Sequence, residues 1–215
     1  MIIGPDRWRK PLLLLWLIIF LIVAFNIIFP MPVFSIIDNL AFSFQSRLLP
    51  HWLLLISTPF SWFATGFGNA LLILALVFLL WGFKYKIPAT WLLFTNISGW
   101  LLISILSLFL HHQVSGGQTV FPNKAIFLST LLLAYLFNII LPEIKRIRYQ
   151  LLFQTVCLIF FALILVNQLG KNNAVPSDLL GGWILALIWL TYTEIYYVKY
   201  AKEFRRRVIF RNSWY

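Results

Sequence analysis

Acidic residues, cysteine and histidine are all scarce in this chain of 215 residues. It holds six Asp and Glu, one Cys and three His, against 17 Lys and Arg. The single cysteine, Cys157, excludes an internal disulfide and a zinc site built from cysteines. Charged residues make up 11% of the chain, less than half of the roughly 25% that is typical of soluble domains. This composition argues against a soluble protein.

Apolar residues take the place of the missing charge, at 61% of the chain with ten tryptophans. A helix needs about 20 mostly apolar residues to cross a bilayer, and Trp gathers at the headgroup level. The first apolar run follows Arg and Lys but lacks a small-residue cleavage site, so we expect a retained span and no signal peptide. The sequence predicts an all-α integral membrane protein, with residues 1–215 forming a single six-span domain. The predicted spans are residues 11–29, 62–83, 88–110, 122–142, 150–168 and 177–198.

The formal net charge of +11 is distributed in a way that predicts topology. Fourteen of the 17 basic residues fall before the first span, between spans two and three, between spans four and five, or in the tail 199–215. With six spans these four places share one side, and the positive-inside rule makes it cytoplasmic, together with both termini. We therefore expect no nucleic-acid partner. The clusters are Arg7, Arg9 and Lys10; Lys84 and Lys86; Lys145, Arg146 and Arg148; and Lys199, Lys202, Arg205, Arg206, Arg207 and Arg211.

The stretch 31–50, between the first two spans, is too polar to cross the membrane. Phe34, Ile37, Leu40 and Ala41 follow helical spacing, and Asp38 stands toward the edge of that stripe, as does Gln45. This pattern predicts an amphipathic helix lying on the outer face.

Polar residues within apolar spans usually face protein or water, because they are costly in lipid. We expect structural roles for these residues, and we expect Glu194, near the cytoplasmic end of the last span, to pair with Lys199. The polar residues in question are Asn26, Asn69, Asn96, Asn138 and Glu194.

Three segments occur in an order that is typical of one membrane enzyme family. They are "SIIDNLAFSF" after the first span, "FATGFGNALLILAL" at the second and "VPSDLLGGWILAL" at the last. The chain, over about residues 11 to 198, resembles the type-2 phosphatidate phosphatase and vanadium haloperoxidase superfamily in its six-span lipid-phosphatase branch. The strongest local match is Pro176, Ser177, Asp178, Gly181, Gly182 and Trp183.

The resemblance implies a set of reactive residues, and most of them are missing here. In the family, a Lys and two Arg hold the phosphoryl group, one His attacks phosphorus, an Asp orients that ring, and a second His protonates the leaving group. No Lys or Arg lies between Lys86 and Lys124, where the first motif belongs. Ala125 stands at the acid histidine, Gln168 at an arginine and Ala174 at the nucleophile, so we expect no catalytic residues.

Only Asp178 is retained from that reactive set. With Ala174 in place of the imidazole, we expect Asp178 to have no ring to orient and to cap the last helix instead. Gly181 and Gly182 are expected to permit close helix contact.

Two adjacent histidines, His111 and His112, end the third span. One interpretation is a polar pair that marks the end of the span. The other is a rebuilt phosphatase site that uses one of them, with Lys124 and Lys171 binding the anion. Adjacent residues on a helix diverge by about 100°, so we expect no metal site and no cofactor.

Several polar residues are expected to meet at the outer mouth of the bundle. They are candidates for binding a headgroup, because amide and cationic side chains hydrogen-bond phosphate or sugar without attacking it. The alternative is that they are solvated loop residues. The candidates are His111, His112, Asn123, Lys124, Asn167, Gln168 and Lys171, with Asn172 and Asn173 beside them.

Three functions are compatible with these patterns. The first is a catalytically inactive lipid-phosphatase-like protein that binds a lipid or polyprenyl phosphate headgroup, or supports a membrane-protein partner in envelope lipid metabolism. The second is an active phosphatase of lipid phosphates with a displaced site, and the third is a purely structural membrane subunit. We favour the first, in a bacterial cytoplasmic (inner) membrane with its site on the extracytoplasmic side and membrane lipids as partners.

Overall fold

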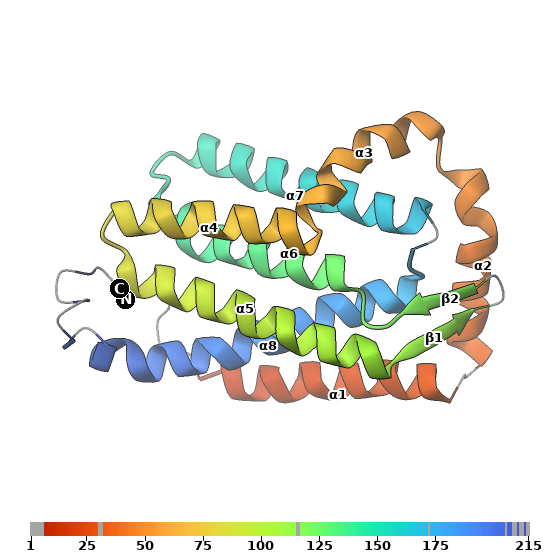
Figure 1. Cartoon of the computed structure of the whole chain (residues 1–215), viewed down its shortest axis with the longest axis horizontal. Coiled ribbons are helices and arrows are strands. Elements are labelled where there is room, and N and C mark those ends of the chain that lie inside the picture. The colour runs from red at the N-terminus through yellow and green to blue at the C-terminus, as the bar shows by residue number, and fades with distance from the viewer. Residues whose placement is uncertain are drawn as a thin grey trace.

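The computed structural model describes residues 7–29, 32–114, 117–171, 173–204, 206, 207, 210 and 213. Most of its helices run roughly along one direction, and the helix Pro32–Leu48 lies across the right-hand end of Figure 1 beside a two-stranded hairpin. The elements are α1 (Arg9–Ile28), α2 (Pro32–Leu48), α3 (His51–Phe63), α4 (Gly66–Gly82), α5 (Lys86–Phe109), β1 (His111–Val114), β2 (Gly117–Val120), α6 (Lys124–Tyr135), η1 (Leu136–Ile140), η2 (Leu141–Glu143), α7 (Ile147–Gly170) and α8 (Pro176–Phe204).

Five helical segments of the described chain are long and apolar enough to cross a membrane. They are Arg9–Ile28, Lys86–Phe109, Lys124–Glu143, Ile147–Gly170 and Pro176–Ala201. The segment Lys124–Glu143 continues α6 through a π-turn and a 3₁₀ turn. A sixth crossing is available only if α3 and α4, which meet at an angle of 60°, count as one broken span. The predicted all-α fold is thus confirmed, with five to six helices of the described chain long and apolar enough to span a membrane.

The bend between α3 and α4 changes the predicted second span. We expected a helix over 62–83, but its straight part begins at Gly66. Thr65 caps α4 by accepting a hydrogen bond from the Gly68 amide at 3.4 Å. A Cβ on Gly68 would lie 2.2 Å from the backbone oxygen of Trp62. Glycine therefore permits the close backbone approach that turns α3 away from the bundle axis.

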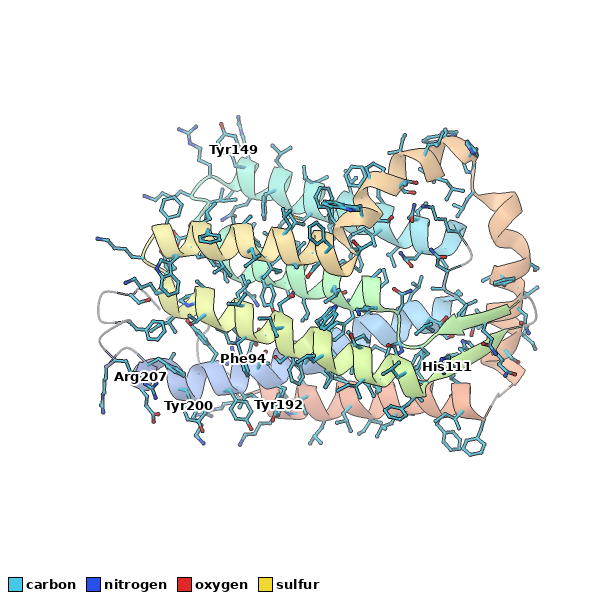
Figure 2. The ribbon with its side chains drawn as sticks, in the orientation of Figure 1. Phe94, His111, Tyr149, Tyr192, Tyr200 and Arg207 are labelled. Carbon is cyan, nitrogen blue, oxygen red and sulfur yellow. The ribbon has the colours of Figure 1, made fainter. Side chains whose placement is uncertain are left out.

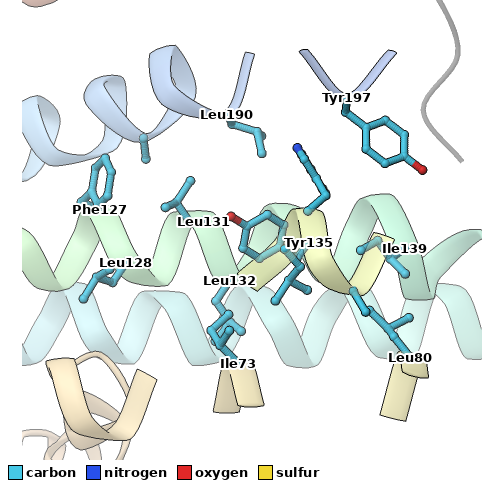
Figure 3. Packing of buried hydrophobic residues seen from close by; sticks show 14 of the residues in the cluster. Ile73, Leu80, Phe127, Leu128, Leu131, Leu132, Tyr135, Ile139, Leu190 and Tyr197 are labelled. Carbon is cyan, nitrogen blue, oxygen red and sulfur yellow. The ribbon is translucent and has the colours of Figure 1, made fainter. Parts of the chain in front are cut away.

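The largest core cluster lies between α4, α5, α6 and α8 (Figure 3). Tyr135 stands at its centre, and its ring meets the Trp91 ring edge-on with centroids 5.5 Å apart. The Trp91 indole also donates to the Thr193 backbone oxygen at 3.3 Å. Helices in lipid gain little from the hydrophobic effect between them, so such fitted aromatic contacts and interhelical hydrogen bonds hold the bundle together.

Polar residues within the spans face protein, as expected. Asn96 donates to the Asn69 side chain at 3.2 Å, and Asn69 donates to the Leu128 backbone oxygen at 3.4 Å. The prediction for Glu194 is wrong in its partner. Glu194 forms an ion pair with Arg9 of α1 at 3.1 Å, not with Lys199, and also accepts from Asn138 at 3.2 Å. The Arg9 side chain reaches Glu194 because α1 and α8 pack side by side.

The basic clusters gather at one end of the bundle. The start of α1, the turn between α4 and α5, the start of α7 and the end of α8 all lie at the left of Figure 1. Tyr149 and Arg207 are labelled there in Figure 2, while His111 lies toward the opposite end. Arg205 and Arg211 of the predicted tail fall outside the described residues. The shared end agrees with the charge pattern from which cytoplasmic termini were predicted.

The opposite end carries α2 and a two-stranded antiparallel hairpin, β1–β2. The helix predicted within 31–50 is present as α2, which lies across this end and packs against α7, α8 and β1. The hairpin was not predicted, because residues 111–121 were assigned to a loop. These two elements, with the end of α1 and the start of α8, enclose the candidate site.

Candidate functional site

The hairpin separates the two adjacent histidines. In its register His111 lies opposite Val120 and His112 opposite Thr119. Neighbouring residues on a strand point to opposite faces, so the two rings diverge by about 180°, not by the helical 100° that the sequence suggested. His111 is exposed and His112 is buried. The two histidines therefore have different surroundings, and His112 has contacts inside the protein that His111 lacks.

His112 points at the carboxylate of Asp178, in the first turn of α8. Its Nδ1 lies 3.0 Å from Asp178 Oδ1, and Asp178 is completely buried. A carboxylate only accepts, so Nδ1 carries the proton and Nε2 remains for another partner. The expectation that Asp178 has no ring to orient is wrong: a ring is supplied by the hairpin instead of by position 174.

The capping role predicted for Asp178 is confirmed at the same time. Its second oxygen, Oδ2, accepts from the Val175 amide at 3.2 Å. That amide precedes α8, where amides have no partner within the helix and a carboxylate is favoured by the helix dipole. One buried carboxylate thus fixes both the start of α8 and the His112 ring.

The charges around His112 favour its protonated form. Burial lowers the pKa of His112, but the hydrogen bond to Asp178 and the negative charges of Asp178 and Asp38 raise it by more. The net effect is a pKa raised above the ordinary 6.5. His112 is consequently a cation over a wider pH range than a free histidine.

Asp38 of α2 completes this group from the opposite side. The sequence placed Asp38 at the edge of an apolar stripe, yet it is only 2% exposed, whereas Ile37 and Leu40 are about half exposed. Asp38 Oδ1 accepts from the Ser177 amide at 3.1 Å, which adds a second cap to α8. The polar side of α2 therefore faces the bundle and its apolar residues face outward.

Four buried side-chain oxygens at this end have no hydrogen-bond partner among the described residues. They are Asn26 Oδ1, Asp38 Oδ2, Thr119 Oγ1 and Ser177 Oγ. Buried polar atoms in folded proteins are nearly always paired, so each such atom requires a partner. They come from α1, α2, β2 and α8, the elements that meet around His112.

A cavity of about 530 Å³ opens between α1, α2 and the hairpin. It is large enough for a small ligand or a lipid headgroup. Asn26 and Asp38, which carry two of the unpartnered oxygens, are among its lining residues, and so is His112. The lining residues are Asn26, Ile27, Ile28, Phe34, Ser35, Asp38, Asn39, Phe109, Leu110, His111, His112 and Gln113.

Of the seven residues predicted to bind a headgroup, only His111 and His112 line this cavity. Lys124 points along α5, where its Nζ lies 2.9 Å from Ser104 Oγ and 4.5 Å from the centre of the Trp100 ring. Lys171 is exposed where α7 ends. Neither lysine belongs to the group around His112.

The three predicted amide residues serve packing. Asn123 caps α6 by accepting from the Ile126 amide at 3.0 Å, and donates to Gln168 at 3.4 Å. Asn167, which is 1% exposed, donates to Ser57 of α3 at 3.0 Å. These contacts join α6, α7 and α3. Asn173 is exposed, and Asn172 lies outside the described residues.

Ala125 and Ala174 occupy the places where the resemblance puts the two reactive histidines. Both belong to one apolar cluster between α6, α7 and α8, which also holds Ile126, Ile164 and Leu179. Ala174 is fully buried there. At these two positions the chain has close hydrocarbon packing, which offers no group for acid–base or nucleophilic chemistry.

The retained glycines make the close contacts that were expected, although the neighbour is not another spanning helix. A Cβ on Gly182 would lie 2.4 Å from the backbone oxygen of Asn123, and one on Gly181 would lie 2.1 Å from the Phe121 ring. The Asn123 amide also donates to the Asp178 backbone oxygen at 3.0 Å. The start of α8 is thus pressed against the loop that enters α6.

Sequence reasoning missed Asn26, Asp38, Thr119 and Ser177 as members of the site. The available signal was the pattern "HHQVSGGQTV", in which a Gly-rich turn between two short runs indicates a hairpin. Across the described ranges, His, Cys, Asp and Glu do not form a group of three or more suited to a metal ion. The cluster is therefore better suited to hydrogen bonding and proton exchange than to metal coordination.

Comparison of the whole chain with protein-family models, with curated proteins and with solved structures gives no match in any of the three.

Proposed function

We propose that this chain is a catalytically inactive, lipid-phosphatase-like membrane protein that binds a lipid headgroup in the cavity beside His112. In this proposal the basic end of the bundle is cytoplasmic and the cavity faces the extracytoplasmic side. The observation that carries it is a cavity lined by polar and apolar residues, among them Asn26, Asp38 and His112, in a chain whose Ala125 and Ala174 lie in an apolar cluster where the phosphatase chemistry would have to lie.

Electrostatics support binding without phosphoryl transfer. Among the described residues that line the cavity there is no Lys or Arg, whereas Asp38 is present, and Asp178 is hydrogen-bonded to His112. Phosphoryl transfer needs several positive groups around the transferred phosphate. One histidine beside a carboxylate supplies fewer positive groups than this chemistry uses.

The depth of the cavity supports a lipid ligand. Asn26, Ile27 and Ile28 lie in the last turns of α1, and Phe109 lies in the last turn of α5. Ends of spans are where headgroups lie in a bilayer. Ile36, Ile37 and Leu40 of the adjoining α2 present exposed apolar side chains, as a helix at the membrane surface does.

The test is a pair of measurements on purified protein in nanodiscs of stated lipid composition. Thermal stability is recorded across discs that carry phosphatidylcholine alone or with phosphatidate, phosphatidylglycerol, phosphatidylethanolamine or a polyprenyl phosphate, and phosphate release is measured in parallel. We expect stability to depend on the headgroup and no phosphate to be released. Equal stability in every disc would favour a purely structural subunit and contradict the proposal.

The His112–Asp178 hydrogen bond favours one second candidate, an active phosphatase with a displaced site. An oriented imidazole with a free Nε2 is a competent nucleophile or general acid. This candidate requires phosphate release that is lost in His112→Ala and kept in His111→Ala, because the exposed neighbour is the matched control. Absence of release from wild-type protein across the lipid phosphates would eliminate it.

A further inference from the structure

We infer that the ligand of the cavity beside His112 carries a primary ammonium, as the ethanolamine headgroup of a zwitterionic phospholipid does. The inference rests on the proposed function and adds the chemical class of the headgroup. The observation behind it is that the cavity wall offers unpartnered acceptors and unbalanced negative charge, and not the reverse.

The first step concerns hydrogen bonds. Asn26 and Asp38 both line the cavity, and Asn26 Oδ1 and Asp38 Oδ2 are buried oxygens that lack a partner among the described residues. A carboxylate oxygen and an amide oxygen can only accept. The ligand must therefore donate at least two hydrogen bonds, which an ammonium with three N–H groups does and a phosphate or a quaternary amine does not.

The second step concerns charge. Within the described residues the ion pairs are Arg9 with Glu194 and His112 with Asp178. Asp178 has His112 as its partner, whereas the Asp38 carboxylate is in neither pair, is 2% exposed and accepts a hydrogen bond from the Ser177 backbone amide. A buried carboxylate is costly until a cation pairs with it. A ligand with one positive charge supplies that pairing.

The third step concerns the other half of a zwitterionic headgroup. An ammonium bound at Asp38 places the attached phosphate a few bonds away, toward the rim, where His111 and Gln113 also line the cavity. Both side chains can donate hydrogen bonds to phosphate oxygens. His111 is exposed, in keeping with a place at the rim. The cavity thus offers acceptors inside and donors at its mouth.

The decisive experiment changes only the number of N–H donors on the ligand. Wild-type protein is placed in phosphatidylcholine nanodiscs that contain equal fractions of lipids with ethanolamine, N-methylethanolamine or N,N-dimethylethanolamine headgroups, and bound lipid per protein is measured by native mass spectrometry. We expect occupancy to fall once fewer than two N–H groups remain, at the dimethylated headgroup and further at choline, with choline about tenfold weaker than ethanolamine, because two buried acceptors need two donors.

A variant pair tests the residue assignment. Asp38→Asn keeps the size and the acceptor for the Ser177 amide but replaces the second oxygen with an NH₂ donor, so ethanolamine preference should fall about tenfold or more. Glu143→Gln removes the same charge at the opposite end of the bundle, where Glu143 accepts from Tyr85, and should leave the preference unchanged. The methylation series on wild-type protein tests the inference even if Asp38→Asn fails to fold.

Further experiments distinguish a lipid from a soluble amine as the ligand. They also distinguish a failure of the ammonium inference from a failure of headgroup binding in general. Free ethanolamine added to phosphatidylcholine discs tests a soluble amine; stabilisation by it equal to that by the lipid would overturn a lipid source. Equal binding of ethanolamine and choline lipids, or strongest binding of phosphatidate, would overturn the ammonium and leave headgroup binding standing. Equal stability in every disc, with water alone in the cavity, would overturn both.

Discussion

Replacement of His112 by alanine should lower the free energy of unfolding by about 3 kcal/mol. The substitution leaves Asp178 Oδ1 without its partner at 3.0 Å in a completely buried position. An unpaired buried charged group costs roughly 2–3 kcal/mol, and loss of a mostly buried ring adds about 1 kcal/mol. The Val175 amide still holds Oδ2, which keeps the loss below the roughly 5 kcal/mol that a fully isolated buried charge can cost.

The pairwise part of that loss can be isolated with a double-mutant cycle. His112→Ala, Asp178→Asn and the double variant are unfolded in mixed detergent micelles, with helical circular dichroism as the readout. Because the two side chains contact each other directly, we expect a coupling of about 2 kcal/mol. The double variant should therefore be more stable than the sum of the single losses predicts.

The same cycle should depend on pH in one direction. The pKa of His112 is raised in the folded state above the ordinary 6.5, so folding takes up a proton on this ring. Its charge contribution to stability is fully present below the unfolded pKa and is lost as pH rises through the higher folded pKa. The stability gap between wild type and His112→Ala should shrink upward from about pH 6. The groups facing the ring are Asp178 on α8 and Asp38 on α2.

Two outcomes would refute this reasoning. Losses that simply add in the double variant would mean that His112 and Asp178 do not interact in solution. A gap that widens as pH rises would mean that burial dominates over the two carboxylates and that His112 is held neutral.

Four other substitutions have clear expected outcomes. Gly182→Ala should destabilise the protein by about 2 kcal/mol or more, because its Cβ would lie 2.4 Å from a backbone oxygen. Gly82→Ala is the control and should be neutral or slightly stabilising, because its Cβ would have nothing within 4 Å. Thermal unfolding of the two variants is compared with that of the wild type. Glu194→Gln should cost about 1–3 kcal/mol in the same assay, because Arg9 loses its ion pair. Lys124→Met should leave headgroup preference in nanodiscs unchanged; a large loss there would place its ammonium in the site.

The spans were predictable because they depend on a local quantity, the length of an apolar run. The length of the apolar run did not reveal the break between α3 and α4, because apolar residues continue on both sides of Thr65. Only the glycines that follow Thr65 indicate a turn there. The ends of the spans were predicted to within a few residues elsewhere. Helix α2 was predicted from its periodicity, but the direction of Asp38 depends on what α2 packs against.

The site could be predicted only in part, because its contacts join distant parts of the chain. His112 and Asp178 are 66 residues apart, and Asp38 and Ser177 are 139 residues apart. No spacing rule connects such positions. Residues 111–121 were expected to form a loop between two spans. A loop gives no reason to expect neighbouring side chains on opposite faces, so the burial of His112 and the exposure of His111 were not predicted. Lys124 was expected at the mouth of the bundle, and its contact with the Trp100 ring, 24 residues earlier in the chain, directs it elsewhere.

The pairing of α1 with α8 has a consequence for biogenesis. Arg9 and Glu194 are separated by 185 residues, so the first helix made finds its ion-pair partner only after nearly the whole chain has been synthesised. Contacts between such remote segments form late and expose unpaired groups in the meantime. Until the last segment arrives, the face of the N-terminal helix that packs against α8 has no partner there. Truncation after α7 would therefore remove the helix that α1 packs against and also a neighbour of α2, α5 and α6.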